Sequence, residues 1–281
     1  MNLTTDFSRR FTLDKLDIRG QVVRLSGAWR SLMQGRDYPA NVTAHLGEMA
    51  CVAVIIGAGL KHKGRATLQI QGGALAKLAV IDCTHELGIR GMASYAEQTE
   101  AVSFADWVSG GRVALTVSQF DNNQMYQSIV PVSGLTVAEC FEHYFDQSEQ
   151  LPTHLWIAAD AHGAGALLLQ KLPKADEKDA DGWARVEQLA ASVTADELTN
   201  LDAETMLTRL FHEEDIRLYE PKGVFCDCKR DEEKVKNMLR SLGRDELNQT
   251  LQQLGEIIVK DDMCNEEYRF DLAAVDALFL S

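Results

Sequence analysis

Strand-like and helix-like segments alternate along the first 173 residues, and this pattern restricts the possible folds more than any other feature of the sequence. Thr67–Gln71 alternates apolar and polar residues with the period of two that is typical of a half-buried strand. Glycine pairs and an Asp-Asn-Asn run between the strand-like segments predict turns. The other segments of this kind are 78–83, 113–117, 126–132, 154–158 and 166–170.

Two long helices interrupt these strands. One is predicted from about Pro39, a favourable first-turn residue, to about Gly59. The second begins after Gly134 and carries apolar residues at helical spacing from Val137 to Tyr144. Strands mixed with a few segregated helices indicate an α+β fold, here a mixed sheet-and-helix domain.

A charged stretch without apolar periodicity, Lys174–Asp181, follows Pro173 and predicts a surface linker. Beyond it the pattern is helical, and Thr194-Ala-Asp-Glu197 has the form of a capping box, which marks the start of a helix. We expect an amphipathic helical hairpin that packs on the first domain. Its apolar face consists of Trp183, Val186, Leu189, Leu198, Leu201, Leu210 and Phe211.

The last part of the chain, from about Pro221, predicts a small α+β unit. Two short helices end at Gly243 and Gly255, and two strands follow around a turn. So few large apolar side chains make a marginal core, and such a unit usually needs a metal or a disulfide to stabilise it. We therefore divide the chain into an N-terminal domain (1–175), a helical linker (176–220) and a C-terminal zinc-binding-type domain (221–281).

The cysteines of this small domain predict a metal site. Cys226-Asp-Cys228 opens the domain, and Cys264 lies in the turn between its two strands. Three positions before Cys264, where a C-x-x-C pair would have its first thiol, the residue is Asp261. Zinc accepts thiolate and carboxylate ligands, and an aspartate keeps the charge of the thiolate that it replaces. We expect one Zn²⁺ per chain, bound by Cys226, Cys228, Asp261 and Cys264.

Three alternatives remain open for this site. Asp262 is one position later in the same turn and is an alternative fourth ligand, and His212 is another. In the third alternative the three thiols bind no metal and Asp261 is solvated. The remaining cysteines, Cys51, Cys83 and Cys140, lie in apolar segments, where we expect them to pack as small hydrophobic side chains.

Charge and composition exclude several classes of function. The chain has 28 Lys and Arg against 42 Asp and Glu, a net charge of −14, which disfavours nucleic acid and anionic lipid as partners. The longest apolar run, Ala50–Leu60, is too short to cross a membrane, and Met1–Leu13 has no apolar core of a signal peptide. We therefore expect a cytoplasmic protein whose cysteines are thiols or metal ligands.

Sequence motifs of common enzymes are also missing. The chain contains no G-x-S-x-G, no G-x-x-x-x-G-K-[ST] and no H-E-x-x-H. We expect a protein that is not an enzyme and does not use ATP.

Longer motifs are spread along nearly the whole chain. They include His45–Ala50, Phe225–Cys228 and Cys264–Asp271. Others are 63–73, 89–93, 126–130, 144–153, 165–170, 210–218 and 242–247. In these motifs the chain resembles the heat-shock protein 33 family, the redox-regulated holdase chaperones of bacteria.

The resemblance implies a switch. In that family four thiolates of a C-x-C and a C-x-x-C motif hold zinc; oxidation converts them to disulfides, zinc leaves, and the C-terminal domain unfolds. The linker then loosens, and the exposed apolar surface holds unfolding client proteins without ATP. Active members are homodimers. The resemblance thus implies a stress-response chaperone with Cys226, Cys228 and Cys264 as redox switch and the apolar face of the linker as client-binding surface.

Asp261 departs from the family pattern, because it stands where the family has its third cysteine. No disulfide can form within Asp261-x-x-Cys264. Oxidation can still join Cys226 to Cys228 in a tight ring, which leaves Cys264 to form a sulfenic acid, a mixed disulfide or a bond to a second chain. A site with one thiolate fewer should also hold zinc less tightly, so we expect heat as well as oxidation to trigger the switch.

Two other functions compete with the chaperone. One is a thiol–disulfide oxidoreductase that uses Cys226 and Cys228, which the lack of a C-x-x-C within a βαβ unit disfavours. The other is a zinc-stapled domain that regulates one partner. Turnover of a dithiol substrate and suppression of aggregation of several unrelated proteins separate the three.

Overall fold

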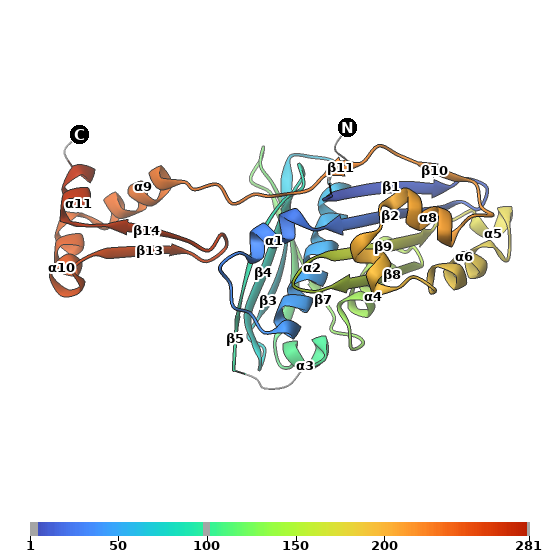
Figure 1. The fold of residues 1–281 in the computed structure, drawn as a ribbon, viewed down its shortest axis with the longest axis horizontal. Coiled ribbons are helices and arrows are strands. Elements are labelled where there is room, and N and C mark those ends of the chain that lie inside the picture. Colours follow the sequence, from blue (N-terminus) through green and yellow to red (C-terminus); the bar gives the residue numbers. More distant parts are fainter. Residues whose placement is uncertain (1–4, 98–101, 280–281) are drawn as a thin grey trace. The chain divides into compact units, whose positions relative to one another are not determined.

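The computed structural model describes residues 5–97 and 102–279, and the chain divides into two compact units, 1–227 and 228–281 (Figure 1). The first unit consists of two sheets with helices between and over them. The second consists of a β-hairpin with helices packed on it. Both are mixtures of helices and mainly antiparallel strands, so the predicted α+β class is confirmed.

Sheet A lies on the side of the first unit where the linker helices pack. Its strands are β10 (Ile216–Leu218), β1 (Phe7–Leu13), β2 (Ile18–Leu25), β9 (Ala164–Lys171) and β8 (Thr153–Ala159), with β11 (Lys222–Gly223) beside β1. All of these pairs are antiparallel. Seven consecutive residues of β9 are buried, because this strand is covered on both faces of the sheet.

Sheet B is the second sheet of this unit, and one of its edge strands, 125–130, is largely exposed. Its order is β12 (Phe225–Cys226), β5 (Gly88–Tyr95), β4 (Ala76–Thr84), β3 (Gly64–Gln71), β6 (Arg112–Gln119) and β7 (Met125–Val130). Only the β12–β5 pair is parallel. β3 alternates buried and half-buried residues, as the period of two in its sequence predicted.

Helix α2 (Ala40–Gly59) forms the core of the first unit. It contacts β2, β8 and β9 of sheet A and β3, β4 and β5 of sheet B, so it lies between the two sheets. It is longer than the apolar run Ala50–Leu60 and is long and apolar enough to cross a membrane, yet 72% of its most apolar 18-residue stretch is buried inside the protein. Packing between two sheets accounts for its apolar composition.

Shorter helices complete the first unit. They are α1 (Gly27–Met33), α3 (Phe104–Val108), α4 (Val137–Glu149), α5 (Ala175–Lys178), α6 (Gly182–Ala190), α7 (Ala195–Asn200) and α8 (Ala203–Leu210). The helix predicted after Gly134 is α4, and the capping box at Thr194 and Glu197 starts α7, so both predictions are confirmed. The charged stretch after Pro173 lies on the surface, as predicted, but it includes the short helix α5, in which Ala175 is buried.

The second unit is built around a hairpin of β13 (Ile257–Asp261) and β14 (Glu266–Phe270). Helices α9 (Glu232–Leu242), α10 (Arg244–Leu254) and α11 (Leu272–Leu278) pack on it. The helix ends at Gly243 and Gly255 are confirmed, and both glycines have positive φ angles, 89° and 81°. The buried core is small and consists of Leu239, Leu247, Leu251, Ile257, Tyr268, Phe270, Val275 and Leu278.

Candidate functional site

Cys226 is part of the first unit. It is the last residue of β12 and pairs with Ile89 of β5, and the amide of Asp227 then donates to the carbonyl oxygen of Ile89 at 2.8 Å. The thiol-bearing residue is half-buried, and its neighbour Phe225 is 40% exposed. The chain around Cys226 is therefore held in extended form at the edge of sheet B.

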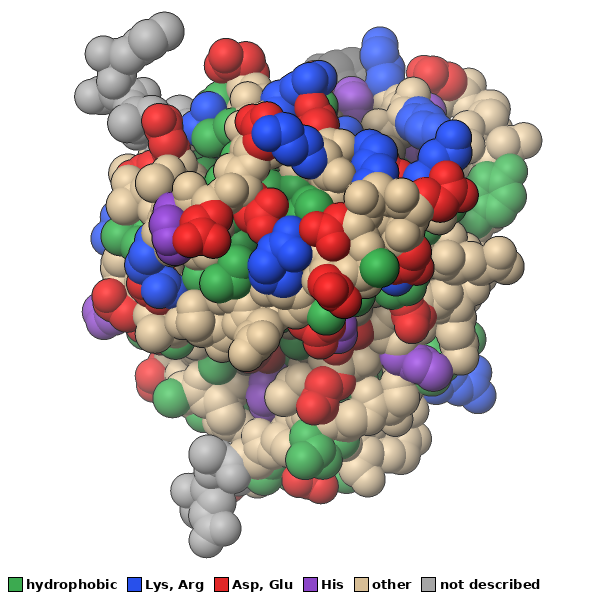
Figure 2. Space-filling model, turned by 90° about the vertical axis from the view of Figure 1, so that its right-hand side faces the viewer, with side chains coloured by type: hydrophobic (Ala, Val, Ile, Leu, Met, Phe, Trp, Pro, Cys, Tyr) green, Lys and Arg blue, Asp and Glu red, His purple; other side chains and the backbone are tan. Residues whose placement is uncertain are grey.

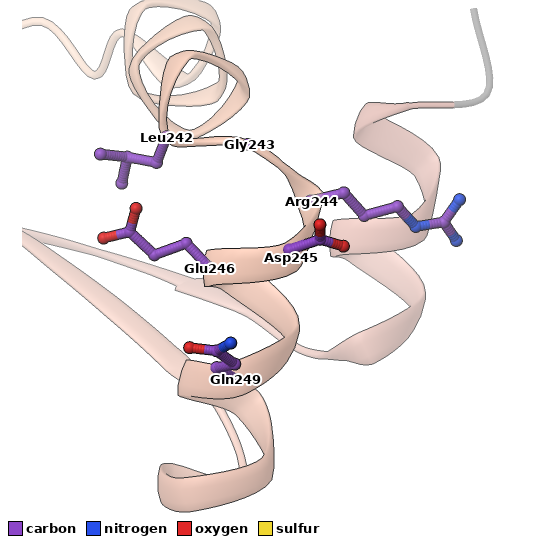
Figure 3. A pocket seen from close by; sticks show the side chains of 6 residues that line it. All are labelled: Leu242, Gly243, Arg244, Asp245, Glu246 and Gln249. Carbon is purple, nitrogen blue, oxygen red and sulfur yellow. The ribbon is translucent and has the colours of Figure 1, made fainter.

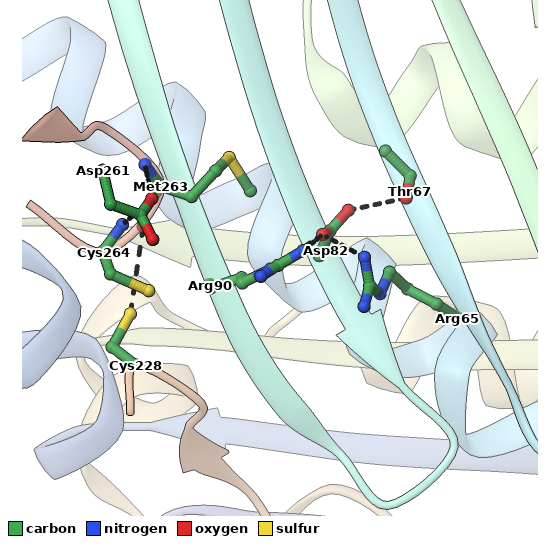
Figure 4. Close-up of polar contacts among 8 residues, drawn as sticks. All are labelled: Arg65, Thr67, Asp82, Arg90, Cys228, Asp261, Met263 and Cys264. Carbon is green, nitrogen blue, oxygen red and sulfur yellow. Dashed lines mark hydrogen bonds and ion pairs between the residues drawn. The ribbon is translucent and has the colours of Figure 1, made fainter. Parts of the chain in front are cut away.

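Cys228, Asp261 and Cys264 come together in the second unit (Figure 4). The Cys228 thiol donates to the carbonyl oxygen of Met263 at 3.9 Å, which places it beside the backbone of Cys264. In Figure 4 the sulfur atoms of Cys228 and Cys264 point toward each other. Both cysteines are half-buried.

Asp261 shapes the turn that carries Cys264. Its carboxylate oxygen Oδ1 accepts the amides of Met263 at 3.0 Å and of Cys264 at 3.4 Å, and its carbonyl oxygen accepts the Cys264 amide at 3.3 Å. Asn265 closes the turn with a positive φ of 54°. Aspartate favours such turns because its side chain can accept amides two and three residues ahead. Asp261 thus holds the turn at the position that a first thiol of C-x-x-C would occupy.

The alternative ligands have other contacts. Asp262 forms an ion pair with Lys260 at 3.6 Å, and His212 lies 3.7 Å from the carboxylate of Glu213 with 66% of its side chain exposed. Over residues 5–97 and 102–279, no group of three or more His, Cys, Asp or Glu side chains is arranged to hold a metal ion.

The donor types nevertheless suit zinc. Cys228 and Cys264 supply thiols and Asp261 a carboxylate around one turn, and Cys226 lies two residues from Cys228. Zinc is bound in proteins by these donors.

The other three cysteines are packed in the core of the first unit, as predicted. Cys51, Cys83 and Cys140 are all buried. Burial raises the pKa of the Cys83 thiol to about 12, with a contribution from Asp82, and burial together with Glu48 raises the pKa of Cys51 further. Since the thiolate is the reactive form, these thiols resist oxidation.

The linker helices cover sheet A with their apolar face, as predicted (Figure 1). The side chains of Val186, Leu198, Leu210 and Phe211 are buried against the sheet. Trp183, Leu189 and Leu201 are partly buried in the same cluster. The sheet contributes Phe11, Ile18, Val22, Leu167 and Leu169, among others, to this cluster.

One glycine allows α7 to lie directly on the sheet. A Cβ atom on Gly165 of β9 would stand 1.9 Å from the carbonyl oxygen of Leu198. No side chain fits between the two backbones. The motif that contains Gly165 therefore has a direct role in docking the linker.

Ion pairs fix the outer side of the linker. Arg185 binds Glu214 at 2.8 Å and Asp179 at 2.9 Å, and Arg209 binds Glu197. Figure 2 shows the face on the right-hand side of Figure 1, where acidic and basic side chains are interspersed and hydrophobic ones form small groups between them. The linker thus presents charge to solvent and its apolar face to the sheet.

Comparison with known proteins identifies this arrangement. Residues 6–271 match the family described as Hsp33 protein. The chain belongs to the Hsp33 family. A 33 kDa chaperonin of Methylobacillus flagellatus is 38% identical over 277 residues, covering 98% of this chain and 94% of the relative. A 33 kDa chaperonin of Pseudomonas fluorescens is 40% identical over 285 residues, with the same two coverages.

The fold also agrees with a solved structure. The crystal structure of a 33 kDa chaperonin (heat shock protein 33 homolog) of Thermotoga maritima matches with a TM-score of 0.78 at 20% identity, covering 98% of this chain and 97% of that one. This similarity concerns the fold.

The role of one residue of this Hsp33-family chain was not predicted from the sequence. His154 of β8 lies 3.1 Å from Glu187 of α6 and 3.5 Å from Glu142 of α4, and it stacks on Trp183 of α6. It therefore connects α6 of the linker to β8 and α4. In the sequence it appears as one polar residue of a strand, and its partners are 12 and 33 positions away.

A hollow in the second unit lies where α9 meets α10 (Figure 3). The residues that line it are Leu242, Gly243, Arg244, Asp245, Glu246 and Gln249, and the guanidinium group of Arg244 also pairs with Asp276 of α11. The hollow results from the sharp turn at Gly243 between the two helices.

Proposed function

We propose that this Hsp33-family chain is an ATP-independent holdase chaperone that binds unfolding proteins and prevents their aggregation. Thiol oxidation with zinc release, heat, or both activate it by loosening the linker and the C-terminal domain. The name 33 kDa chaperonin of its relatives supports a chaperone role. In this proposal the protein is not an enzyme.

The observation that carries the proposal is the apolar contact between the linker helices and sheet A. If the helices leave the sheet, both apolar faces become exposed to water. A large exposed apolar surface of this kind is a binding site for other apolar surfaces. Unfolding proteins expose such surfaces. In the resting state, therefore, the linker helices and sheet A cover the apolar surfaces that a client would bind.

The linker helices are short, which favours their release. α6, α7 and α8 have 9, 6 and 8 residues. Isolated helices of this length are marginal in water, so they depend on their contacts with the sheet. Loss of docking and loss of helix should therefore occur together.

Zinc would contribute to the stability of the C-terminal domain in this proposal. Cys226, Cys228, Asp261 and Cys264 would hold one Zn²⁺ per chain. A bound metal supplies folding free energy to a small domain, and the core of residues 228–281 is small. Oxidation of the thiols removes the donors, because a disulfide is a poor ligand compared with two thiolates.

The proposal also includes the setting in which the protein acts. Activation would produce a homodimer, and the cytoplasm would keep the thiols reduced in the resting state. The net charge of −14 would keep a protein with exposed apolar surface soluble. Nucleic acid, membrane and ATP have no part in it.

Aggregation assays test the proposal. The purified chain is reduced or treated with peroxide at two temperatures, and light scattering of several unrelated unfolding proteins is followed without ATP. We expect the treated chain to suppress aggregation at about equimolar ratio and the reduced chain at low temperature to do so weakly. Suppression for one protein alone would favour the regulatory domain, and catalytic turnover of a dithiol substrate would favour the oxidoreductase.

A further inference from the structure

The two half-buried thiols of the second unit face each other across the turn between β13 and β14. The Cys228 sulfur lies 3.9 Å from the carbonyl oxygen of Met263, the residue bonded to Cys264. The sulfur atoms of Cys228 and Cys264 point toward each other (Figure 4). We propose that oxidation joins Cys228 to Cys264, and that Cys226 is left as the single thiol.

The geometry disfavours a bond between Cys226 and Cys228. Cys226 ends a strand, and the ladder continues through the Asp227 amide, so the chain there is extended. Residues two apart in a strand have Cα atoms about 6.6 Å apart. Their side chains lie on the same face at about the same spacing, whereas the Cβ atoms of a disulfide lie about 3.5–4.5 Å apart. Joining Cys226 to Cys228 would therefore require this stretch of chain to leave its strand conformation.

Asp261 removes the other local pairing. A carboxylate cannot form a disulfide, and this carboxylate holds the turn through the amides of Met263 and Cys264. The turn thus presents Cys264 without a neighbouring thiol in its own segment. Cys228 is the thiol that the second unit places beside it.

The chemical step requires a peroxide as oxidant. One of the two thiolates attacks the peroxide, the O–O bond breaks, and a sulfenic acid and water (or an alcohol) form. The second thiolate attacks that sulfur, and the sulfenic oxygen leaves as water while the S–S bond forms. Two sulfurs each lose one electron, and the peroxide takes up both electrons and two protons.

A bond between Cys228 and Cys264 would act differently from a bond between the neighbouring Cys226 and Cys228. It closes a ring of 264 − 228 = 36 positions, which contains α9, α10 and β13. A cross-link of this kind restricts the unfolded chain and favours the folded one. Oxidation would therefore remove two zinc donors and at the same time cross-link the part of the C-terminal unit that lies between them. This consequence rests on the proposed function: oxidation releases zinc, and heat then completes the loosening of the linker in the cross-linked chain.

Peptide mapping of the full-length chain tests the pairing. After peroxide treatment and alkylation, digestion before aspartate cuts between Cys226 and Asp227 and so separates the two neighbouring cysteines. We expect residues 227–230 linked to residues 262–270, with Cys226 in a separate, unlinked peptide. A main product that joins Cys226 to either other cysteine, a bond between chains, or thiols that all stay reduced would overturn the proposal.

Two matched variants sharpen the result. Cys226→Ser should keep the Cys228–Cys264 bond, whereas Cys228→Ser should lose it. Equal loss of the linked peptide in both variants would contradict the assignment. These mapping results do not depend on chaperone activity, so they remain decisive even if the aggregation assays fail.

Limited proteolysis of the full chain tests the consequence. We expect residues 228–281 of the oxidised chain to be cleaved more slowly than those of the chelator-treated reduced chain at the same temperature. Faster cleavage after oxidation, with the Cys228–Cys264 bond present, would show that the bond does not hold the unit together.

Discussion

The imidazole ring of His154 stacks on the indole ring of Trp183, with centroids 5.5 Å apart and planes at 18°. The same ring forms ion pairs with Glu142 of α4 at 3.5 Å and with Glu187 of α6 at 3.1 Å. Its hydrogen bond to Glu142, helped by the charges of Glu187 and Asp146, raises the pKa of His154 above its usual range. One histidine thus joins the first linker helix to β8 and α4.

The raised pKa predicts a linker that loosens as pH rises. A group whose pKa is higher in the folded state stabilises that state fully below its unfolded value, about 6.5, and loses the effect as pH rises through the folded pKa. We expect His154→Gln to lower the thermal midpoint more at pH 6 than at pH 8.5. The two midpoints are measured by circular dichroism.

The exposed His162 offers a matched control. His162→Gln should leave both midpoints close to those of the parent chain. An equal drop at the two pH values in His154→Gln would mean that the ring acts only through its packing on Trp183.

Phe211 predicts how the covered surface is released. Its side chain is 0% exposed, and its ring lies 6.3 Å from that of Phe11. Truncation of a buried phenylalanine costs about 3–5 kcal/mol. We expect the Phe211→Ala variant, without oxidant, to suppress the aggregation of unfolding proteins at a temperature where the parent chain suppresses it only weakly. Leu254→Ala, at a position 71% exposed, is the control and should behave like the parent.

The segments that could be predicted are those whose pattern is complete within the segment itself, and the segments that were missed depend on contacts with distant parts of the chain. β3 was found because its alternation is complete within eight residues. β1 was missed because Arg9 and Arg10 interrupt the alternation, and their partners are the carbonyl oxygens of Tyr219 and Ala58. A local pattern cannot show that distant backbone groups bind these charges.

The candidate site also has features that the sequence predicts and features that it does not. The apolar face of the linker was predictable because helical spacing reveals it before the sheet beneath is known. The sequence places Cys228 and Cys264 in one predicted metal site, but the hydrogen bond of the Cys228 thiol to the carbonyl oxygen of Met263 was not predictable, since it depends on how the hairpin turn folds over 36 positions of chain, 264 − 228. His154 was missed for a similar reason, because its function arises from two carboxylates on separate helices.

Sheet B contains a carboxylate whose loss should be costly (Figure 4). Asp82 is 5% exposed; its Oδ2 lies 2.9 Å from Arg90 and 3.1 Å from Arg65, and its Oδ1 accepts the Thr67 hydroxyl at 2.6 Å. Removing one partner of a buried ion pair leaves the others uncompensated. We expect Asp82→Ala to lower the free energy of unfolding by about 3 kcal/mol in urea titrations.

An exposed ion pair gives the comparison for Asp82. Lys15 and Asp215 are 3.4 Å apart with side chains 76% and 65% exposed. Asp215→Ala should change the free energy of unfolding by less than about 1 kcal/mol. Equal losses of unfolding free energy in the two variants would show that burial does not determine how much the Asp82 cluster stabilises the protein.

Asp261 predicts the strength of metal binding. Zinc favours thiolate over carboxylate, so Asp261→Cys should retain zinc longer than the parent chain when a chelator is added. Asp261→Ala should hold clearly less than the one zinc per chain that we expect of the parent purified under reducing conditions. Elemental analysis gives the zinc content, and a colorimetric chelator follows the release.

Asp261→Asn separates the two functions of this side chain. Asparagine can still accept the amides of Met263 and Cys264 through its side-chain oxygen, but it lacks the charge of a metal ligand. We expect it to keep the turn and to lose zinc almost as readily as the alanine variant. If Asp261→Asn retains zinc like the parent while Asp261→Ala does not, the carboxylate acts by shaping the turn, and the fourth ligand is another residue.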